Sequence, residues 1–283
     1  MLELQLKKGT LFENVLEASL DLVNEASVDC SSTGFSLQAV DAKRVGMLSV
    51  LFPAQVFEHY RCDVDGSMGI TIADMVKALR CANDDDIIDI KADDQNNSIA
   101  LTFHSSKENS TTAFGLRLVD AKSHRLVVPE WQFLDSTYEA IFCMSSVDFM
   151  RICKSLSGID NEVVISVTKE VVKFFACGKR GSLSIVYRQN ETLGKTHYDV
   201  REPVSLTLDL SCLNSCTRAF ALFDQVKIRL STKLPMMVEC KIKEKGYIRY
   251  SIAPKILTEV EDEVEGKTEN VEEGTKGNKT MQD

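Results

Sequence analysis

The amino-acid sequence predicts an α+β protein made of two similar domains, each built from sheets and two helices. Short stretches rich in Val, Ile and Phe alternate with a period of two along most of the chain, which is typical of antiparallel strands. Only four segments show helical spacing of apolar residues instead. The order of strands and helices in the first half is repeated from about Tyr138, and such an internal repeat determines the architecture.

The predicted strands are separated by polar turns. They are residues 36–41, 47–52, 86–93, 98–104, 115–120, 139–144, 162–167, 171–178, 182–188, 204–210, 225–231, 237–243 and 247–253. Residues 28–39 form a predicted hairpin whose apolar positions match those of residues 163–176, about 136 residues later. This similarity within the chain supports a duplicated domain.

Four segments are predicted to be helices. In the first, residues 10–25, the side chains of Leu11, Val15, Leu16, Leu20 and Val23 lie on one stripe. The others are residues 72–82, 147–157 and 210–222. Each is about three turns long, close to the mean length of a helix in globular proteins.

The repeat divides the chain into an N-terminal domain over residues 1–117, a connector over 118–134 and a C-terminal domain over 135–256. The connector holds Pro129 and the only tryptophan, and loops of this length are usually functional or disordered. Residues 257–283 form an acidic tail with few large apolar side chains, which we expect to be disordered.

The charge of the chain does not exclude a nucleic-acid partner. The net charge is -9, and the tail contributes nine acids and three lysines, or -6, so that the remaining residues carry only -3. A local basic surface is therefore possible, although phosphates require cations. The nine cysteines include no C-x-x-C pair and are expected to be reduced, mostly buried side chains.

No membrane segment or secretion signal is predicted, because no apolar run approaches ~20 residues and no charged stretch precedes an apolar core at the start. We therefore expect an intracellular protein. Phosphate-binding and zinc-helix motifs are missing, the four histidines are far apart, and Asp84, Asp85 and Asp86 lack the spacing of a calcium loop. These features favour a non-enzyme with no catalytic residue, metal or cofactor. An alternative from another class is a nuclease or glycosidase built on paired carboxylates, which DNA hydrolysis with magnesium or manganese would reveal.

Seven phrases in order resemble the proliferating cell nuclear antigen (PCNA) family of eukaryotic DNA sliding clamps. They are LVNEASVDCSSTGFSLQAVD, HYRCDVDGSMGI, KALRCANDDDIIDIKADD, RLVD, FMRICKSLS, EPVSLTL and YIRYSIAPKI, within residues 1–256. The resemblance implies two clamp domains per chain, and a head-to-tail homotrimeric ring with sheets outside and helices around a central hole. A heterotrimeric checkpoint clamp is a second alternative, but its subunits diverge from these phrases.

The resemblance also implies that cations on the helices contact duplex DNA without reading its sequence. The matching residues are Lys77, Arg80, Arg151, Lys154 and Arg218. The first helix departs from the family, because Glu13, Asn14 and Leu20 stand where lysines are common. We therefore expect a loose hold on DNA.

Two protein-binding surfaces follow from the same resemblance. The subunit interface would include Phe114, Leu116, Leu183 and Ile185. The pocket for the PIP box, a short partner motif, would include Val40, Arg44, Val45, Met47, Leu126, Val128, Pro129, Pro235, Ser251, Ala253 and Pro254. Arg44 and Ser251 replace a common His and Tyr, which predicts weaker peptide binding. Lys169 matches a lysine that the family modifies with ubiquitin-like proteins.

The function implied by the resemblance is that of a nuclear processivity factor for replicative DNA polymerase. Its expected partners are the polymerase, the clamp loader, flap endonuclease, DNA ligase and other replication and repair proteins that carry PIP boxes.

Overall fold

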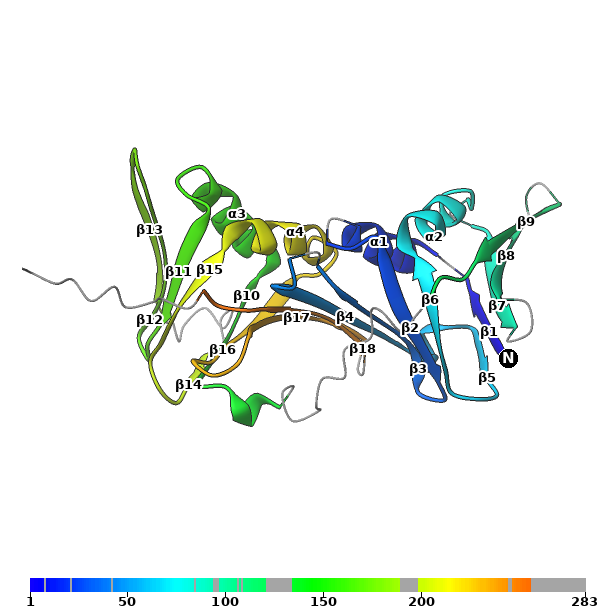
Figure 1. Cartoon of the computed structure of the whole chain (residues 1–283), viewed down its shortest axis with the longest axis horizontal. Coiled ribbons are helices and arrows are strands. Elements are labelled where there is room, and N and C mark those ends of the chain that lie inside the picture. The colour runs from blue at the N-terminus through cyan, green and yellow to red at the C-terminus, as the bar shows by residue number, and fades with distance from the viewer. Residues whose placement is uncertain are drawn as a thin grey trace, which may run out of the picture.

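The computed structural model describes most of the chain. The described residues are 1–7, 9–20, 22–41, 43–83, 85–93, 97–105, 107, 109–120, 134–188, 198–243 and 246–255. Figure 1 shows an elongated molecule with helices along one side and strands fanning out below them. No helix in these ranges is long and apolar enough to cross a membrane.

The first half of the chain alternates strands with two helices. In order, its elements are β1 (Leu2–Leu6), α1 (Thr10–Ser19), β2 (Glu25–Ser31), β3 (Gly34–Val40), β4 (Gly46–Pro53), the 3-10 turn η1 (Ala54–Val56), β5 (His59–Cys62), β6 (Gly66–Thr71), α2 (Ile72–Leu79), β7 (Ile87–Asp93), β8 (Ser98–Ser105) and β9 (Ser110–Arg117).

The second half repeats this order. After the short turn η4 (Asp135–Thr137), its elements are β10 (Ala140–Ser145), α3 (Ser146–Ser157), β11 (Glu162–Val167), β12 (Val171–Gly178), β13 (Gly181–Arg188), β14 (Tyr198–Val200), β15 (Val204–Asp209), α4 (Leu210–Phe220), β16 (Gln225–Leu230), β17 (Met236–Ile242) and β18 (Gly246–Ile252). The predicted α+β fold with an internal duplication is confirmed.

The two halves share one sheet. A five-stranded sheet has the order β5-β1-β7-β8-β9, and a four-stranded sheet has the order β13-β12-β11-β15. Between them, a nine-stranded sheet runs β14-β10-β16-β17-β18-β4-β3-β2-β6. Its middle is the antiparallel pairing of β4 with β18, which joins strands from different halves. The edge strands β9 and β13 remain at opposite ends of the molecule (Figure 1).

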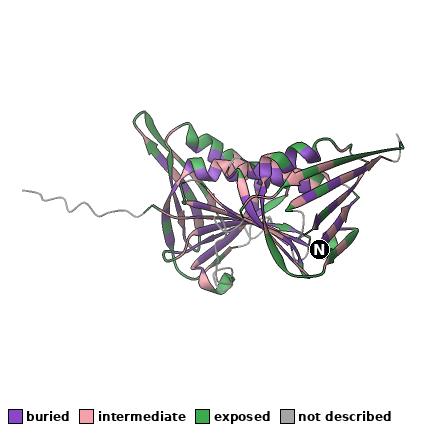
Figure 2. Cartoon of the chain, turned by 45° about the vertical axis from the view of Figure 1, so that its right-hand side comes forward, coloured by how far each residue is buried: buried purple, intermediate pink, exposed green. Residues whose placement is uncertain are grey.

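The four described helices form one row on the same side of the sheets (Figure 1). In this row α1 contacts both α2 and α4, and α4 contacts α3. Each helix buries one side against the sheets and exposes the other (Figure 2). A single large cluster of buried side chains therefore lies between the helices and the strands, with Phe12, Phe149 and Phe220 among its largest members.

The first helix is shorter than predicted. Its regular part ends at Ser19, whose hydroxyl donates to the carbonyl of Val15 (2.7 Å). Leu22 and Val23 donate their amides to the carbonyl of Ser19 and form a turn after the helix. Val23 is therefore buried, as predicted, but it is not part of the helix. A local turn thus replaces the last helical turn because β2 must begin at Glu25.

A buried ion network ties three strands together on the face away from the helices. Glu239 on β17 is only 5% exposed and accepts hydrogen bonds from Arg249 on β18 (2.6 Å) and Arg229 on β16 (3.3 Å). Arg229 also donates to Asp135 (2.7 Å). Burial opposes ionisation of Glu239, but the two arginines outweigh it and hold the pKa of its carboxyl below the ordinary value.

We expect Glu239→Gln to lower the free energy of unfolding by about 3 kcal/mol, because it removes the carboxylate shared by the buried Arg229 and the half-buried Arg249 and so weakens the compensation of their charges. Since the pKa of Glu239 is lowered on folding, its contribution is present at neutral pH and is lost as the pH falls through that lowered pKa. Urea unfolding at neutral and acidic pH measures both effects.

The matched control is Glu162→Gln, which removes an exposed ion pair with Lys255 and should cost less than about 1 kcal/mol. An equal decrease in the free energy of unfolding of the two variants would contradict a stabilising role for the buried network.

Candidate functional site

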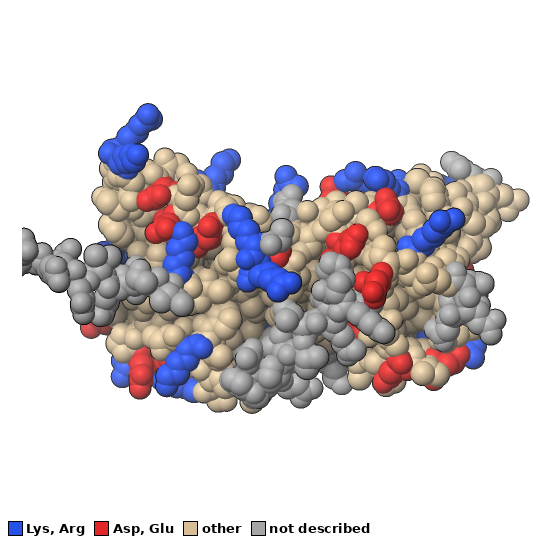
Figure 3. Space-filling view, viewed as in Figure 1, with Lys and Arg blue, Asp and Glu red and all other residues tan. Residues whose placement is uncertain are grey.

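The helix side carries the cations that the sequence singled out. Lys77 and Arg80 lie on or just after α2, Arg151 and Lys154 lie on α3, and Arg218 lies on α4. All five are exposed, on the side of the helices away from the core. Figure 3 shows Lys and Arg side chains along this edge of the molecule, with acidic side chains among them. The surface therefore has the chemistry needed to contact phosphate, but it is not uniformly basic.

Three of these cations, Lys77, Arg80 and Arg151, form ion pairs with acidic neighbours. Arg80 donates to Glu17 on α1 (2.5 Å), and Lys77 pairs with Asp74 one turn earlier (3.2 Å). Both pairs are substantially exposed, so water and salt weaken them. α1 itself carries no Lys or Arg between Thr10 and Ser19. Its contribution to the helix side is acidic, because it carries Glu13 and Glu17.

Arg151 has two partners on the same side. Its guanidinium donates to Asp148 (2.8 Å) and to the hydroxyl of Tyr187 on the edge strand β13 (3.2 Å). The second bond links α3 to one open edge of the molecule. Neither the Arg80 pair nor the Tyr187 contact was predicted, since their partners are distant in sequence.

The opposite face of the nine-stranded sheet gathers the described part of the predicted partner pocket. Met47 on β4 lies directly between Val40 on β3 and Ser251 on β18. The amide of Ala253 donates to the carbonyl of Val45 (2.9 Å), which holds the end of β18 beside the β3–β4 loop. Pro235 and Pro254 flank the same strands and are half-buried. Leu126, Val128 and Pro129 lie outside the described residues.

The β3–β4 loop has a fixed shape. One carboxylate oxygen of Asp41 accepts the amides of Val45 (2.7 Å) and Gly46 (2.9 Å). Arg44 has a φ of 56°, a left-handed conformation that is uncommon for a residue with a side chain. Arg44 is exposed and Val45 is half-buried. The loop thus presents the apolar Val45 and the exposed charges of Lys43 and Arg44 beside the predicted pocket residues.

The four predicted interface residues lie on the two open edges. Phe114 and Leu116 are on β9, and Leu183 and Ile185 are on β13. All four are half-buried and pack against the core, and the ring of Phe114 contacts that of Phe103 with centroids 6.1 Å apart. Apolar side chains on unpaired edge strands favour association with another chain.

Lys169 is exposed in the tight turn between β11 and β12, where Thr168 accepts the amides of Glu170 and Val171. Its position permits modification. Sequence reasoning missed two further cations, Lys179 and Arg180, in the turn between β12 and β13. The GKRG sequence of this turn was the available signal.

Within the described part of the chain, no group of three or more His, Cys, Asp or Glu side chains could hold a metal ion. Asp86 accepts the amide of Asn83 (2.8 Å), and Asp85 pairs with Lys107. These carboxylates therefore close a turn.

A row of helices with exposed cations, backed by sheets with edge strands at opposite ends, has the chemistry of a DNA-binding clamp. Two family models agree with this class. The N-terminal domain of proliferating cell nuclear antigen matches residues 1–125, and its C-terminal domain matches residues 132–255. The chain belongs to the PCNA family of DNA sliding clamps, which act by binding DNA and client proteins and have no enzymatic activity.

The pairing of Arg80 with Glu17 predicts that Glu17→Gln strengthens binding to duplex DNA. The freed guanidinium can replace a counterion at one more phosphate, which steepens the salt dependence of log K by about 0.9. Fluorescence anisotropy with a linear duplex at several salt concentrations measures this slope. Glu58→Gln, an exposed acid before β5, is the control and should leave the slope unchanged.

Proposed function

We propose that the protein is a homotrimeric ring that encircles duplex DNA in the nucleus and serves as a processivity factor for replicative DNA polymerase. It also docks replication and repair proteins that carry PIP boxes, among them the clamp loader, flap endonuclease and DNA ligase. The observation that carries this proposal is the β4–β18 pairing, because it is a complete junction between two repeated units inside one chain.

The open edges are the repeated counterparts of the paired ones. Val119 donates its amide to the carbonyl of Gly69 (3.0 Å), and Lys255 donates in the same way to Thr207 (2.8 Å). These matching bonds align β9 with β18. Phe114 stands five residues before Val119, and Tyr250 stands five residues before Lys255. Phe114 therefore corresponds to Tyr250.

The hairpins align β13 with β4 in the same way. Leu37 stands three residues after Gly34, where the β2–β3 turn ends, and it pairs with Val50. Phe174 stands three residues after Val171, where the β11–β12 turn ends, and it pairs with Ile185. Leu183 therefore corresponds to Leu48. Because Tyr250 lies opposite Leu48 within the chain, Phe114 of one copy is expected opposite Leu183 of the next.

This pairing is heterologous, since it joins different edges of two copies. A heterologous contact gives a closed ring when the rotation between copies is a simple fraction of a turn. Six similar units from three copies make the ring that the family resemblance implies. A row of helices on the same side of every unit then surrounds the hole.

The charges on the helices support a loose hold on the DNA inside this ring. Phosphate contacts position a protein without reading bases, which suits sliding. The acids of α1 and the paired state of Arg80 reduce the number of available cations. A closed ring stays on DNA by topology and does not need strong contacts.

We expect Phe114→Ala to weaken the trimer strongly. The counterpart Tyr250 is only 1% exposed, and truncating an aromatic side chain in such a place costs ~3 kcal/mol or more, about a hundredfold in the dissociation constant. Light scattering behind gel filtration measures the mass against three times 31.6 kDa. Val64→Ala, an apolar truncation at a 71% exposed position, should leave the mass unchanged.

A Phe114→Ala variant that remains trimeric at nanomolar concentration would refute this edge pairing. A monomeric wild type would overturn the ring itself.

The described pocket residues beside the β3–β4 loop support the expectation of micromolar binding of a PIP peptide. Val45→Asp and Leu126→Asp should abolish binding by placing a charge at an apolar contact, whereas Ser251→Tyr should strengthen it by adding an aromatic wall. Titration calorimetry with one peptide decides this. Val64→Asp introduces the same charge at a distant exposed position, and undiminished affinity in Val45→Asp would mean that partners dock elsewhere.

A further inference from the structure

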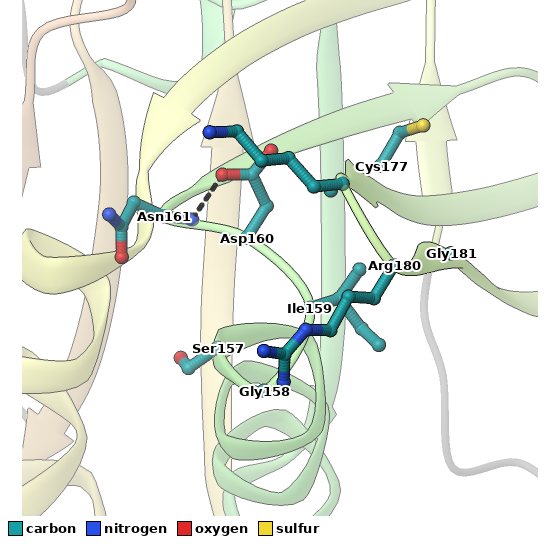
Figure 4. A pocket seen from close by; sticks show the side chains of 10 residues that line it. Ser157, Gly158, Ile159, Asp160, Asn161, Cys177, Arg180 and Gly181 are labelled. Atoms are coloured by element: carbon teal, nitrogen blue, oxygen red, sulfur yellow. Dashed lines mark hydrogen bonds between the residues drawn. The ribbon is translucent and has the colours of Figure 1, made fainter.

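Each open edge of the molecule is accompanied by a pocket. Beside β13, a pocket of about 600 Å³ lies between the end of α3 and the turn that joins β12 to β13 (Figure 4). Beside β9, a pocket of about 410 Å³ lies between the start of α2 and the end of β9. The two pockets differ in chemistry, and the difference indicates how two copies recognise each other.

The pocket beside β13 is bordered by cations. Lys179 and Arg180 form the tip of the β12–β13 hairpin and are exposed. Figure 4 shows the Arg180 side chain extending toward Ser157 and Gly158 at the end of α3. Asp160 on the far wall accepts the amide of Asn161 (2.6 Å). Among the described residues, neither Lys179 nor Arg180 forms an ion pair.

The pocket beside β9 combines one acid, Asp74, and one exposed cation, Arg117, with apolar walls. Asp74 stands at its mouth in the first turn of α2, and Met75, Leu116 and Leu118 supply apolar surface. The carboxylate of Asp74 is 53% exposed and contacts only Lys77 among the ion pairs of the described chain. It is therefore accessible to a cation from another molecule.

Inside the chain, the counterpart of this arrangement is already assembled. The β3–β4 loop lies beside the end of β18, since the Val45 carbonyl accepts the Ala253 amide (2.9 Å), and Lys255, two residues further on, donates to Thr207 (2.8 Å), three residues before α4. Burial raises the pKa of the Cys212 thiol, and the charges of Asp209, Asp41 and Lys43 act on it as well. The loop tip therefore lies close to the first turn of α4.

The repeat transfers this contact to the open ends. Ile72 donates to Asn24 as Leu210 donates to Asn161 (both 2.8 Å), so α2 aligns with α4 and Asp74 takes the place of Cys212. Since β13 aligns with β4, Gly181 takes the place of Gly46 and the Lys179–Arg180 tip takes the place of the β3–β4 loop. A tip from one copy is thus brought to the Asp74 of the next.

We propose that the two pockets are halves of one electrostatic latch between copies of this chain, in which the Lys179–Arg180 tip enters the pocket beside β9 and pairs with Asp74 of the next copy. This inference rests on the proposed ring and names the charges that select its head-to-tail order. Opposite charges across an interface favour the correct pairing, and like charges disfavour pairing of two identical edges.

A charge-swap experiment tests the latch. Arg180→Asp and Asp74→Arg should each weaken the trimer roughly fivefold or more per junction, and the chain carrying both changes should recover much of the loss. Mass photometry at nanomolar concentration and exchange between fluorescently labelled subunits measure trimer dissociation. Lys169→Asp reverses a charge in the β11–β12 turn, at the other end of β12, and should have no effect.

The outcomes separate the latch from the ring. A trimeric wild type with single variants that dissociate no faster, or with no recovery in the double variant, would overturn the latch and leave the ring intact. A monomeric wild type would instead overturn the ring. Repeating the measurements without residues 257–283 tests another partner for the tip, because effects of Arg180→Asp that vanish on this deletion would assign the tip to the acidic tail.

Discussion

The pairing of β4 with β18 determines how the two halves of the molecule are arranged. It joins the four strands β4-β3-β2-β6 of the first half to the five strands β14-β10-β16-β17-β18 of the second half. The two repeated units therefore share one hydrogen-bonded sheet. The shared sheet keeps the helices of both halves on one side, and it leaves β9 and β13 unpaired at opposite ends. The helix row, the gathering of the described pocket residues beside the β3–β4 loop and the exposure of β9 and β13 at opposite ends all follow from this junction.

The fold could be predicted from the sequence because its signals are local. Alternating strands such as residues 171–178 and apolar stripes in the helices bury one side each, and the structure contains most of them at the expected places. The strand predicted at 115–120 was misplaced, because β9 spans Ser110–Arg117 and begins in the polar residues of its hairpin. The end of α1 was wrong, since Leu20 and Val23 continue the apolar stripe into a turn that only the start of β2 explains. Phe12, one of the largest buried side chains, was absent from the predicted stripe.

The candidate site was less predictable, because its interactions join distant residues. Glu17 and Arg80 meet only because α1 packs beside α2, and Arg151 reaches Tyr187 only because α3 packs on β12, the neighbour of β13. Lys179 and Arg180 show no helical spacing, since they occupy a two-residue turn. The predicted pocket residues came from the family resemblance, and the structure brings those it describes to one face of the nine-stranded sheet.

The same junction imposes an order on folding during synthesis. Gly46 and Ile252 are paired although they are about 200 residues apart, and contacts of such long range form late. Until the second half has been made and folded, β4 is an open edge with the same repeated geometry as β13. In the proposed ring β9 pairs with β13 of another copy, and the same strand could then pair with the exposed β4, so that premature association of an incomplete chain with a finished one would compete with correct folding. Rapid completion of the C-terminal half protects the chain from this error.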